Sequence, residues 1–425
     1  MSTPSEQHYD ALETRSADAR EAALSQALPA QVRAALAVPA FAQRLGAVDA
    51  AAITSRAALA GLPVTRKHEL LDLQKAARAA GGDAFGGFSA LGWRSNAAAR
   101  PARRVFQSPG PIYEPEGAAS DYWRVARAMF AAGLRGGDLI HNSFSYHLTP
   151  AGSMMETGAH ALGCSVFPGG VGNTELQLQA MQDLRPDAYA GTPSFLRILI
   201  EKAEEGGTPL PSLKKALVSG EAFPPALRDW LATRGLHAYQ AYATADVGLI
   251  AYETQARQGL VIDEAVIVEI VRPGTGDPVP EGEVGEVVVT VLNADYPMLR
   301  FGTGDLSAVL AGPCPTGRTN QRIKGWMGRA DQTAKVRGMF VHPSQVAEVL
   351  KRHPELLKAR LVVEGEMAND RMTLHAETGS AAEGLATALA GSVRDVTKLR
   401  AEIQLSAPGS LPNDGKVIDD QRRIG

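Results

Sequence analysis

The sequence has little of what marks secreted, membrane or nucleic-acid-binding proteins. It holds 2 cysteines among 425 residues, too few for a disulfide framework in a chain long enough to bury a core without one. No run of 18 apolar residues occurs, so no membrane span is expected, and residues 1–30 lack the pattern of a signal peptide. A net charge of −3 argues against general affinity for nucleic acid or an anionic membrane. We therefore expect a cytoplasmic protein, and an enzyme in particular.

Between residues 105 and 250, short apolar runs alternate with amphipathic helical stretches. Each run is followed by a turn signal, a rhythm that predicts crossover units around a parallel sheet. Upstream, apolar residues at helical spacing between Arg15 and Leu45 predict helices that lie on this body. Thr65 is the expected N-cap of a further helix. The predicted strands of the parallel sheet are 139–142, 165–168, 188–191 and 216–220.

The pattern of apolar and turn-forming residues changes twice after residue 250. Between residues 259 and 311, β-branched runs separated by Pro/Gly turns predict antiparallel strands. After Gly328, helical stretches alternate with strands again. The sequence thus predicts an α/β protein, in which a large multi-layer body with parallel-rich sheets and an antiparallel β subdomain (1–328) precedes a small α+β domain (329–425). The antiparallel strands are expected at 266–271, 285–292 and 306–310, and the late helices and strands at 344–352, 382–394, 359–363 and 371–376.

Two polar clusters follow strands of the predicted parallel sheet. Gly220 and Glu221 stand directly after one strand, at the end where parallel sheets bind ligands. Further on, Tyr242 offers a stacking face for a base, and Asp246 offers a carboxylate that could hold a divalent cation. Plain alternatives exist for both clusters: a strand-to-helix turn for the first, a core tyrosine and a capping aspartate for the second.

Two more clusters lie closer to the C-terminus. Asp305 ends a glycine-rich segment that starts at Gly302, and such a carboxylate can accept bonds from the two vicinal hydroxyls of a ribose. A hairpin turn is the alternative for this segment. The charged stretches 328–332 and 335–338, bracketed by glycines, stand at the boundary between the predicted domains, where a solvated linker is the alternative.

In this order and spacing, the clusters resemble the adenylate-forming acyl-CoA ligase superfamily, and within it the phenylacetate–CoA ligase family. The resemblance implies an α/β fold whose small C-terminal domain is a mobile lid. It also implies an AMP-forming acid–thiol ligase, which activates a carboxylic acid (aryl and phenylacetate-like) with ATP to an acyl-adenylate and passes the acyl group to coenzyme A. Further matches cover nearly the whole chain: His8-Tyr9-Asp10, Leu62-Pro63-Val64-Thr65-Arg66-Lys67, Pro168-Gly169-Gly170, Gly191-Thr192-Pro193-Ser194, Val341-His342-Pro343-Ser344-Gln345 and Gly415-Lys416.

The same resemblance implies a role for each matched residue. Asp246 would hold Mg²⁺ near the α-phosphate, and Asp331 would lie at the hinge of the lid. Lys416 would reach the carboxylate and the α-phosphate during adenylation, where a cation stabilises the charge that develops. The small-molecule partners would be the carboxylic acid, ATP and coenzyme A, with a homodimer left open. The implied nucleotide-binding residues are Gly220, Glu221, Tyr242, Ala243, Asp305 and Arg329, the thioester loop is Lys335, Arg337 and Gly338, and the acyl pocket includes Tyr146, Tyr189 and Gly191.

The chain departs from the family at the phosphate loop, which falls at residues 107–117. The family has a Ser/Thr/Gly-rich loop followed by lysine, whereas here Ser108 and Gly110 stand among prolines that cannot donate an N–H, and the lysine is missing. Two carboxylates, Glu114 and Glu116, would repel a triphosphate. If ATP binds, they must point away from it or share a divalent cation with it. Cys314 lacks the partner cysteines that many relatives have, so we expect no zinc site.

These departures leave three hypotheses open. The chain is an active AMP-forming acyl-CoA or aryl-CoA ligase, an adenylating enzyme whose acyl acceptor is not coenzyme A, or a non-catalytic protein that binds an acyl group or a nucleotide. A Rossmann-type dinucleotide enzyme is an independent alternative. It is disfavoured because residues 169–172 lack the full G-x-G-x-x-G spacing and the acidic ribose partner downstream.

Overall fold

The computed structural model describes residues 7–93, 100–272, 275–327, 330, 334–337, 339–341, 343–366, 369–379, 383–412 and 416–422. The chain divides into two compact units. The first unit comprises Met1–Ser219 and Leu231–Trp326, and the second comprises Gly220–Trp230 and Met327–Gly425. The domain boundary that the sequence predicts, between residues 328 and 329, lies outside the described residues.

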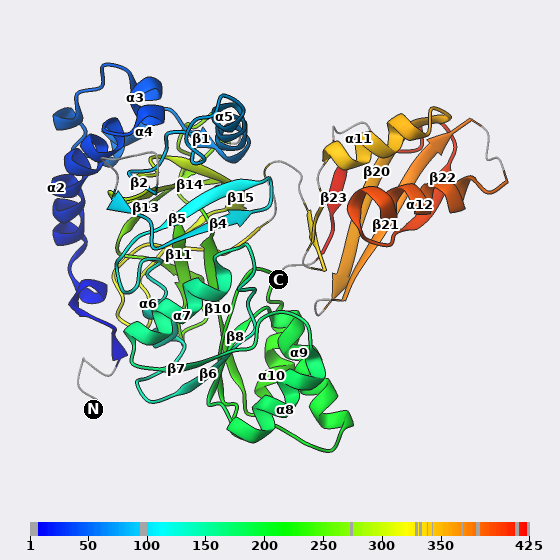
Figure 1. Cartoon of the computed structure of the whole chain (residues 1–425), viewed down its shortest axis with the longest axis horizontal. Coiled ribbons are helices and arrows are strands. Elements are labelled where there is room, and N and C mark those ends of the chain that lie inside the picture. The colour runs from blue at the N-terminus through cyan, green and yellow to red at the C-terminus, as the bar shows by residue number, and fades with distance from the viewer. Residues whose placement is uncertain are drawn as a thin grey trace. The chain divides into compact units, whose positions relative to one another are not determined.

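A nine-stranded sheet forms the centre of the first unit (Figure 1). The strands that come first in the chain, β6 to β10, run parallel, as expected where strands alternate with helices. The strands that come later, β11, β12, β16 and β17, pair antiparallel. The strand order is β16-β17-β12-β11-β10-β9-β8-β6-β7. The parallel strands are β6 (Leu139–Asn142), β7 (Ser165–Pro168), β8 (Ala188–Gly191), β9 (Lys215–Val218) and β10 (His237–Thr244), and the antiparallel ones are β11 (Gly248–Glu253), β12 (Leu260–Ile262), β17 (Arg322–Ile323) and β16 (Val309–Leu310).

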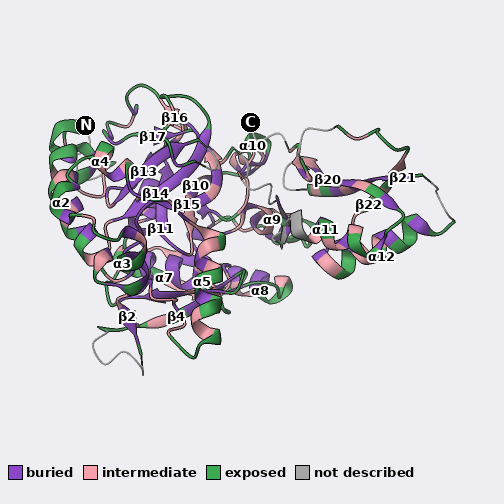
Figure 2. Cartoon of the chain, turned by 90° about the horizontal axis from the view of Figure 1, so that it is seen from above, coloured by how far each residue is buried: buried purple, intermediate pink, exposed green. Residues whose placement is uncertain are grey.

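A second sheet in the same unit has the order β1-β15-β14-β13. Its valine-rich strands β13 (Val266–Val271) and β14 (Gly285–Val291) are buried along their whole length (Figure 2), as in sheets that are covered on both faces. They pair antiparallel, and β14 pairs with β15 (Phe301–Ser307), which in turn pairs parallel with the short β1 (Thr65–Arg66). Two small ribbons accompany this sheet, β2 (Leu91–Gly92) with β3 (Arg100–Pro101) and β4 (Arg104–Ser108) with β5 (Ile112–Glu116).

Helices connect the parallel strands and cover the N-terminal flank of the first unit (Figure 1). Local signals set several of their starts: α9 begins with Pro193 behind the N-cap Thr192, a combination that favours a first helical turn. The helices of the first unit are α2 (Ala17–Leu36), α3 (Pro39–Leu45), α4 (Arg56–Ala60), α5 (Lys67–Ala79), α6 (Ala126–Ala131), α7 (Ala151–Ala161), α8 (Thr174–Leu184) and α9 (Pro193–Glu205), with 3₁₀ turns at Ala11–Thr14 and Ala50–Ala52, and α10 (Pro225–Ala232) crosses the division between the units.

A buried ion network fastens the start of the chain. The Glu13 side chain is fully buried and pairs with the guanidinium groups of Arg127 at 3.2 Å and Arg318 at 3.0 Å. It also accepts a hydrogen bond of 2.9 Å from the Tyr252 hydroxyl. Arg127 pairs in addition with Asp10 at 2.7 Å. Asp10, which belongs to one of the motifs matched in the sequence, therefore serves the fold.

The second unit is a small α+β body with its own hydrophobic cluster. Its sheet has the order β22-β21-β20-β23, in which the long hairpin β20–β21 is antiparallel and both outer pairs are parallel. The strands are β20 (Leu356–Glu366), β21 (Asn369–Thr378), β22 (Glu402–Ser406) and β23 (Ile418–Asp420), with a separate ribbon β18 (Ala334–Val336) and β19 (Met339–Val341), and the helices are α11 (Pro343–Arg352) and α12 (Leu385–Thr397).

The structure confirms the α/β fold class and corrects two local predictions. Thr65 does not cap a helix, because its backbone pairs with Phe301 in β1, and α5 starts two residues later behind the N-cap Arg66. The predicted strand at 306–310 is wrong in its bounds, because β15 starts at Phe301 and ends at Ser307. The glycine-rich segment that reaches Asp305 is therefore strand rather than a hairpin turn. Among the described residues, no helix combines the length and apolar character needed to cross a membrane.

Candidate functional site

Asp305 lies near the end of β15, and donors from two other segments reach its carboxylate. The Tyr242 hydroxyl, carried by β10 of the large sheet, donates to Asp305 Oδ2 at 2.8 Å. The Trp326 indole N–H donates to Asp305 Oδ1 at 3.0 Å. The Asp305 amide in turn donates to Thr303 Oγ1 at 3.1 Å. The structure thus brings together two residues that the sequence analysis selected, Tyr242 and Asp305, across the two sheets.

Trp326 and Thr303 were missed by the sequence analysis. Trp326 stands in the stretch Lys-Gly-Trp-Met-Gly, which has no periodicity and no recognisable motif. The only available signal was its position just before the charged stretch at the domain boundary.

Ala243 follows Tyr242 directly, and the register of β10 against β11 shifts between these two residues. Bulges of this kind re-aim side chains and are common beside active sites.

A buried carboxylate lies at the turn between β10 and β11. Asp246, in that turn, has a fully buried side chain, and Lys67 Nζ donates to its Oδ2 at 2.8 Å. Asp246 Oδ1 is buried and has no hydrogen-bond partner among the described residues. An unpartnered carboxylate oxygen has the chemistry that a hard divalent cation prefers, so Asp246 fits the Mg²⁺ role that the resemblance implies. No group of three or more His, Cys, Asp or Glu side chains suited to a metal occurs within the part of the chain that the structure describes.

The segment expected to be the phosphate loop is a β-hairpin. Strand β4 pairs with β5 in a register that sets Ser108 opposite Ile112, so the turn consists of Pro109, Gly110 and Pro111. Only Gly110 has a backbone N–H to offer there, because proline has none. A phosphate-binding loop normally presents several N–H groups to its anion. The donor set of this turn therefore does not fit a cradle for the β- and γ-phosphates of ATP.

The two carboxylates of this hairpin are held inside the protein. Glu114 is completely buried and accepts a hydrogen bond from the Ser108 hydroxyl. Burial raises the pKa of Glu114 to about 8, the Asp246 carboxylate adds to the rise, and the Lys67 ammonium opposes it. Glu116 is also buried and pairs with Arg104 at 3.2 Å. Glu114 Oε2 is buried without a hydrogen-bond partner among the described residues, so Glu114 is only partly satisfied within the protein, whereas Glu116 is paired. The two conditions that the sequence analysis set for ATP binding therefore both stay predictions.

The predicted acyl-pocket residues lie at the carboxyl ends of β6 and β8. Tyr189 is fully buried in β8, and its hydroxyl donates to Thr192 O at 3.2 Å. A Cβ on Gly191 would overlap the Tyr189 hydroxyl, so glycine is required beside this ring. Tyr146 is half-buried, and its hydroxyl accepts a hydrogen bond of 2.7 Å from Asn142 Nδ2. Tyr189 and Gly191 thus act as one packed unit at the end of β8.

A buried polar network that the sequence analysis did not select adjoins these residues. His141 Nε2 and the Ser143 hydroxyl both contact Gln177 Oε1, at 2.7 Å and 2.8 Å. Gln177 Nε2 donates to Gly170 O at 2.9 Å and Gly172 O at 2.7 Å. Burial lowers the pKa of His141, which favours a neutral ring. The network ties the glycine-rich stretch after β7 to β6.

The site residues predicted in the second unit are described only in part. Lys416 is half exposed and its Nζ donates to Asp419 Oδ1 at 2.9 Å. Arg337 donates from Nη2 to Asp370 O at 2.8 Å, which holds its loop against β21. Gly220 has a positive φ of +81° and precedes Glu221 in the loop after β9. Arg329, Asp331, Gly338 and the side chain of Lys335 lie outside the described residues.

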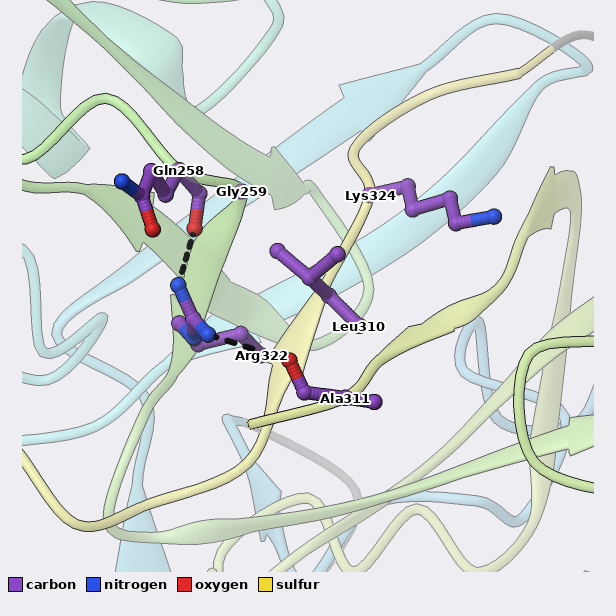
Figure 3. Close-up of a pocket in the computed structure, with 6 residues that line it drawn as sticks. All are labelled: Gln258, Gly259, Leu310, Ala311, Arg322 and Lys324. Carbon is purple, nitrogen blue, oxygen red and sulfur yellow. Dashed lines mark hydrogen bonds between the residues drawn. The ribbon is translucent and has the colours of Figure 1, made fainter. Parts of the chain in front are cut away.

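A groove of about 360 Å³ lies apart from these residues, at the sheet edge formed by β12, β16 and β17 (Figure 3). Arg322, one of its two charged residues, already donates to Gln258 O at 2.7 Å and to Gly312 O at 3.0 Å. None of the predicted site residues lines this groove, so its shape alone does not make it a functional site. Its lining residues are Gln258, Gly259, Leu310, Ala311, Arg322 and Lys324.

Comparison with known proteins gives consistent matches. A family model for AMP-binding enzymes matches residues 126–291. Phenylacetate-coenzyme A ligase of Thermus thermophilus is 35% identical over 262 residues, which span 60% of this chain but only 59% of that protein. The phenylacetate-coenzyme A ligase of Aromatoleum evansii is 31% identical over 311 residues, 68% of this chain and 70% of that protein. A 2-hydroxyisobutyryl-CoA ligase, solved with 2-HIB-AMP and CoA, has a TM-score of 0.79 at 24% identity and covers 100% of this chain and 94% of its own, a likeness of fold.

Proposed function

Because the chain belongs to the phenylacetate–coenzyme A ligase family of AMP-binding enzymes, we propose that it is an AMP-forming acid–thiol ligase. The carboxylate of an acid attacks the α-phosphorus of ATP, and pyrophosphate leaves as the acyl-adenylate forms. The thiol of coenzyme A then attacks the acyl carbon, and AMP leaves as the thioester forms. The curated relatives suggest an aryl acid, phenylacetate or a close analogue, as the substrate.

The arrangement around Asp305 is the observation that carries this proposal. Each oxygen of a carboxylate can accept more than one hydrogen bond, so the donors from Tyr242 and Trp326 do not by themselves fill the acceptor capacity of Asp305. Two vicinal ribose hydroxyls can use that pair of acceptors, as acidic residues do in other nucleotide sites. The Tyr242 ring, tied to Asp305 through its hydroxyl, is held beside the same carboxylate, where a base attached to the ribose would lie. Asp305 would therefore bind the ribose of the adenosine, and the Tyr242 ring would stack on its base.

The resemblance assigns two charged residues, Asp246 and Lys416, to the chemistry at the phosphate. Asp246, with its unpartnered buried oxygen, would hold Mg²⁺, which supplies positive charge at the α-phosphate. Lys416 would bring an ammonium to the carboxylate and α-phosphate, where negative charge grows in the transition state. Arg337 and Gly338 would belong to the loop presented for thioester formation. A homodimer and a cytoplasmic location stay predictions from the sequence.

The test is a pyrophosphate-release assay with a panel of aryl and aliphatic acids, with and without coenzyme A. The ligase proposal expects acid-dependent pyrophosphate release, and thioester with AMP once coenzyme A is added. Release without thioester would favour an acceptor other than coenzyme A.

The nucleotide site is tested by Asp305→Ala and calorimetry with AMP. The variant loses charge-assisted hydrogen bonds of about 1.5–3 kcal/mol each, so AMP should bind at least tenfold more weakly. Asp277→Ala, which removes an exposed carboxylate of the same unit, is the matched control and should bind AMP like the wild type. Unchanged affinity in Asp305→Ala would assign Asp305 a purely structural role.

A second candidate function is favoured by the hairpin at the phosphate loop. Its turn, Pro109-Gly110-Pro111, offers one backbone N–H because proline has none. A protein that binds AMP or an acyl-adenylate without using ATP needs no more than that. If calorimetry finds AMP or an acyl-adenylate bound but no ATP at any Mg²⁺ concentration, this candidate replaces the ligase.

A further inference from the structure

The segment that leaves the first unit runs back along the end of β15 and is fastened to it at three successive points. The Lys324 amide donates to Ala308 O at 2.9 Å. The Ser307 hydroxyl donates to Gly325 O at 2.7 Å. The Trp326 indole N–H then donates to Asp305 Oδ1 at 3.0 Å. Trp326 is the last residue of the first unit, so the chain exits this unit at the carboxylate proposed for ribose.

The indole contact differs from the other two in what it satisfies. The first two bonds end on backbone carbonyls, which any strand end must pair. The third ends on a buried side-chain carboxylate that the Tyr242 hydroxyl also reaches, on the opposite oxygen. Because the Tyr242 hydroxyl and the Trp326 indole hold opposite oxygens, the Asp305 carboxylate cannot rotate without breaking at least one of these two hydrogen bonds.

We infer that Trp326 is a positioning residue of the nucleotide site, whose indole N–H fixes the Asp305 carboxylate in the orientation that accepts both ribose hydroxyls. The inference rests on the ribose assignment of Asp305 under the proposed function. Trp326 acts through Asp305, so its contribution depends on ligands that have ribose hydroxyls. Binding of the ribose hydroxyls to Asp305 must also change the surroundings of the Trp326 indole, because the indole contacts the same carboxylate.

The experiment compares Trp326→Phe with the wild type by calorimetry, using AMP and 2′,3′-dideoxy-AMP. Phenylalanine keeps an aromatic ring but has no donor. We expect AMP to bind about tenfold more weakly to the variant, the scale of one hydrogen bond to a charged group, and dideoxy-AMP to bind equally to both. Trp93→Phe, at a tryptophan that is 49% exposed, is the matched control and should leave both affinities unchanged.

Three results would overturn the inference. An equal loss for AMP and dideoxy-AMP would make Trp326 a packing residue. Unchanged AMP binding would show that the indole does not orient Asp305, and tighter binding would show that it obstructs the ribose. Asp305→Asn, run in parallel, separates these from failure of the proposed function: if that variant binds AMP normally, the ribose assignment itself is wrong.

A second measurement needs no change at Trp326. In the Trp93→Phe protein, AMP should change the tryptophan fluorescence more strongly than dideoxy-AMP does at saturation. Equal changes for the two ligands would count against the inference, even if Trp326→Phe fails to fold.

Discussion

Replacing Glu13 by glutamine should destabilise the first unit more than its conservative chemistry suggests. Glu13 is the one carboxylate that contacts Arg127, Arg318 and Tyr252 together in the described network. The side chains of Arg127 and Arg318 are only 9% and 4% exposed. Glutamine is nearly isosteric, but it removes the negative charge that faces these two guanidinium groups and points an N–H₂ group at donors. Arg127 keeps its pairs with Asp10 and Asp263, so the loss falls mainly on Arg318.

The expected cost follows from the burial of the network. Removal of one partner from a buried ion pair costs about 3–5 kcal/mol, because the remaining charge is left uncompensated in a poorly solvated place. Glu21→Gln is the matched control, since the Glu21–Arg56 pair has side chains that are 49% and 31% exposed. Exposed pairs contribute about 0–1 kcal/mol.

Urea unfolding followed by fluorescence provides the measurement. The midpoint of the first transition should fall clearly for Glu13→Gln and stay near the wild-type value for Glu21→Gln. If the two variants unfold at the same urea concentration, the burial argument for the network is wrong.

Three further predictions concern the candidate site. Because burial raises the pKa of Glu114 from 4.5 to about 8, the folded state keeps a proton that the unfolded state loses, so stability should fall as the pH rises from about 4.5 to about 8. In metal-free buffer, the melting temperature of the wild type should fall over this pH range more than that of Glu114→Gln. An equal fall in both proteins would contradict the prediction. Lys416→Ala should abolish pyrophosphate release yet still convert a supplied acyl-adenylate to the thioester, and adenylation at the wild-type rate would remove Lys416 from that role. Gly191→Ala should lower the melting temperature, since its Cβ overlaps both the hydroxyl and the ring carbon Cζ of Tyr189. Adding Tyr189→Phe should recover little of the loss because the ring carbon stays, and a wild-type melting temperature for Gly191→Ala would contradict the overlap.

The parallel sheet could be predicted from the sequence because its strands are short apolar runs with turn signals behind them. Strands β6 to β8 lie where the pattern predicts them, and β9 differs only at its ends. The strand β15 was predicted too late, because glycine and threonine between Phe301 and Asp305 read as a turn. Pairing of this segment with both β14 and β1 overrides that local preference, as tertiary context often does.

The candidate site was predictable where one residue carries a recognisable role and unpredictable where two distant residues combine. Asp305 and Tyr242 could be chosen as single residues, although their joint hydrogen bond crosses two sheets. The contact of Lys67 with Asp246 joins positions 179 residues apart, and no local pattern marks it. The hairpin at Ser108–Ile112 could be suspected from its prolines, but the burial of Glu114 and Glu116 depends on packing from elsewhere.

The contacts between the start of the chain and residues near 316–319 also determine when the N-terminal segment can fold during synthesis. His8 contacts Thr316 across 308 residues, and Arg20 contacts Thr319 across 299. At about 5–20 residues per second, a ribosome needs roughly 15–60 seconds to make the partners of the first twenty residues. Closing a loop of that length costs about 5 kcal/mol of chain entropy. These polar contacts therefore form late, whereas α2 packs against α3 and the 3₁₀ turn at Ala50–Ala52, which the ribosome makes directly after it.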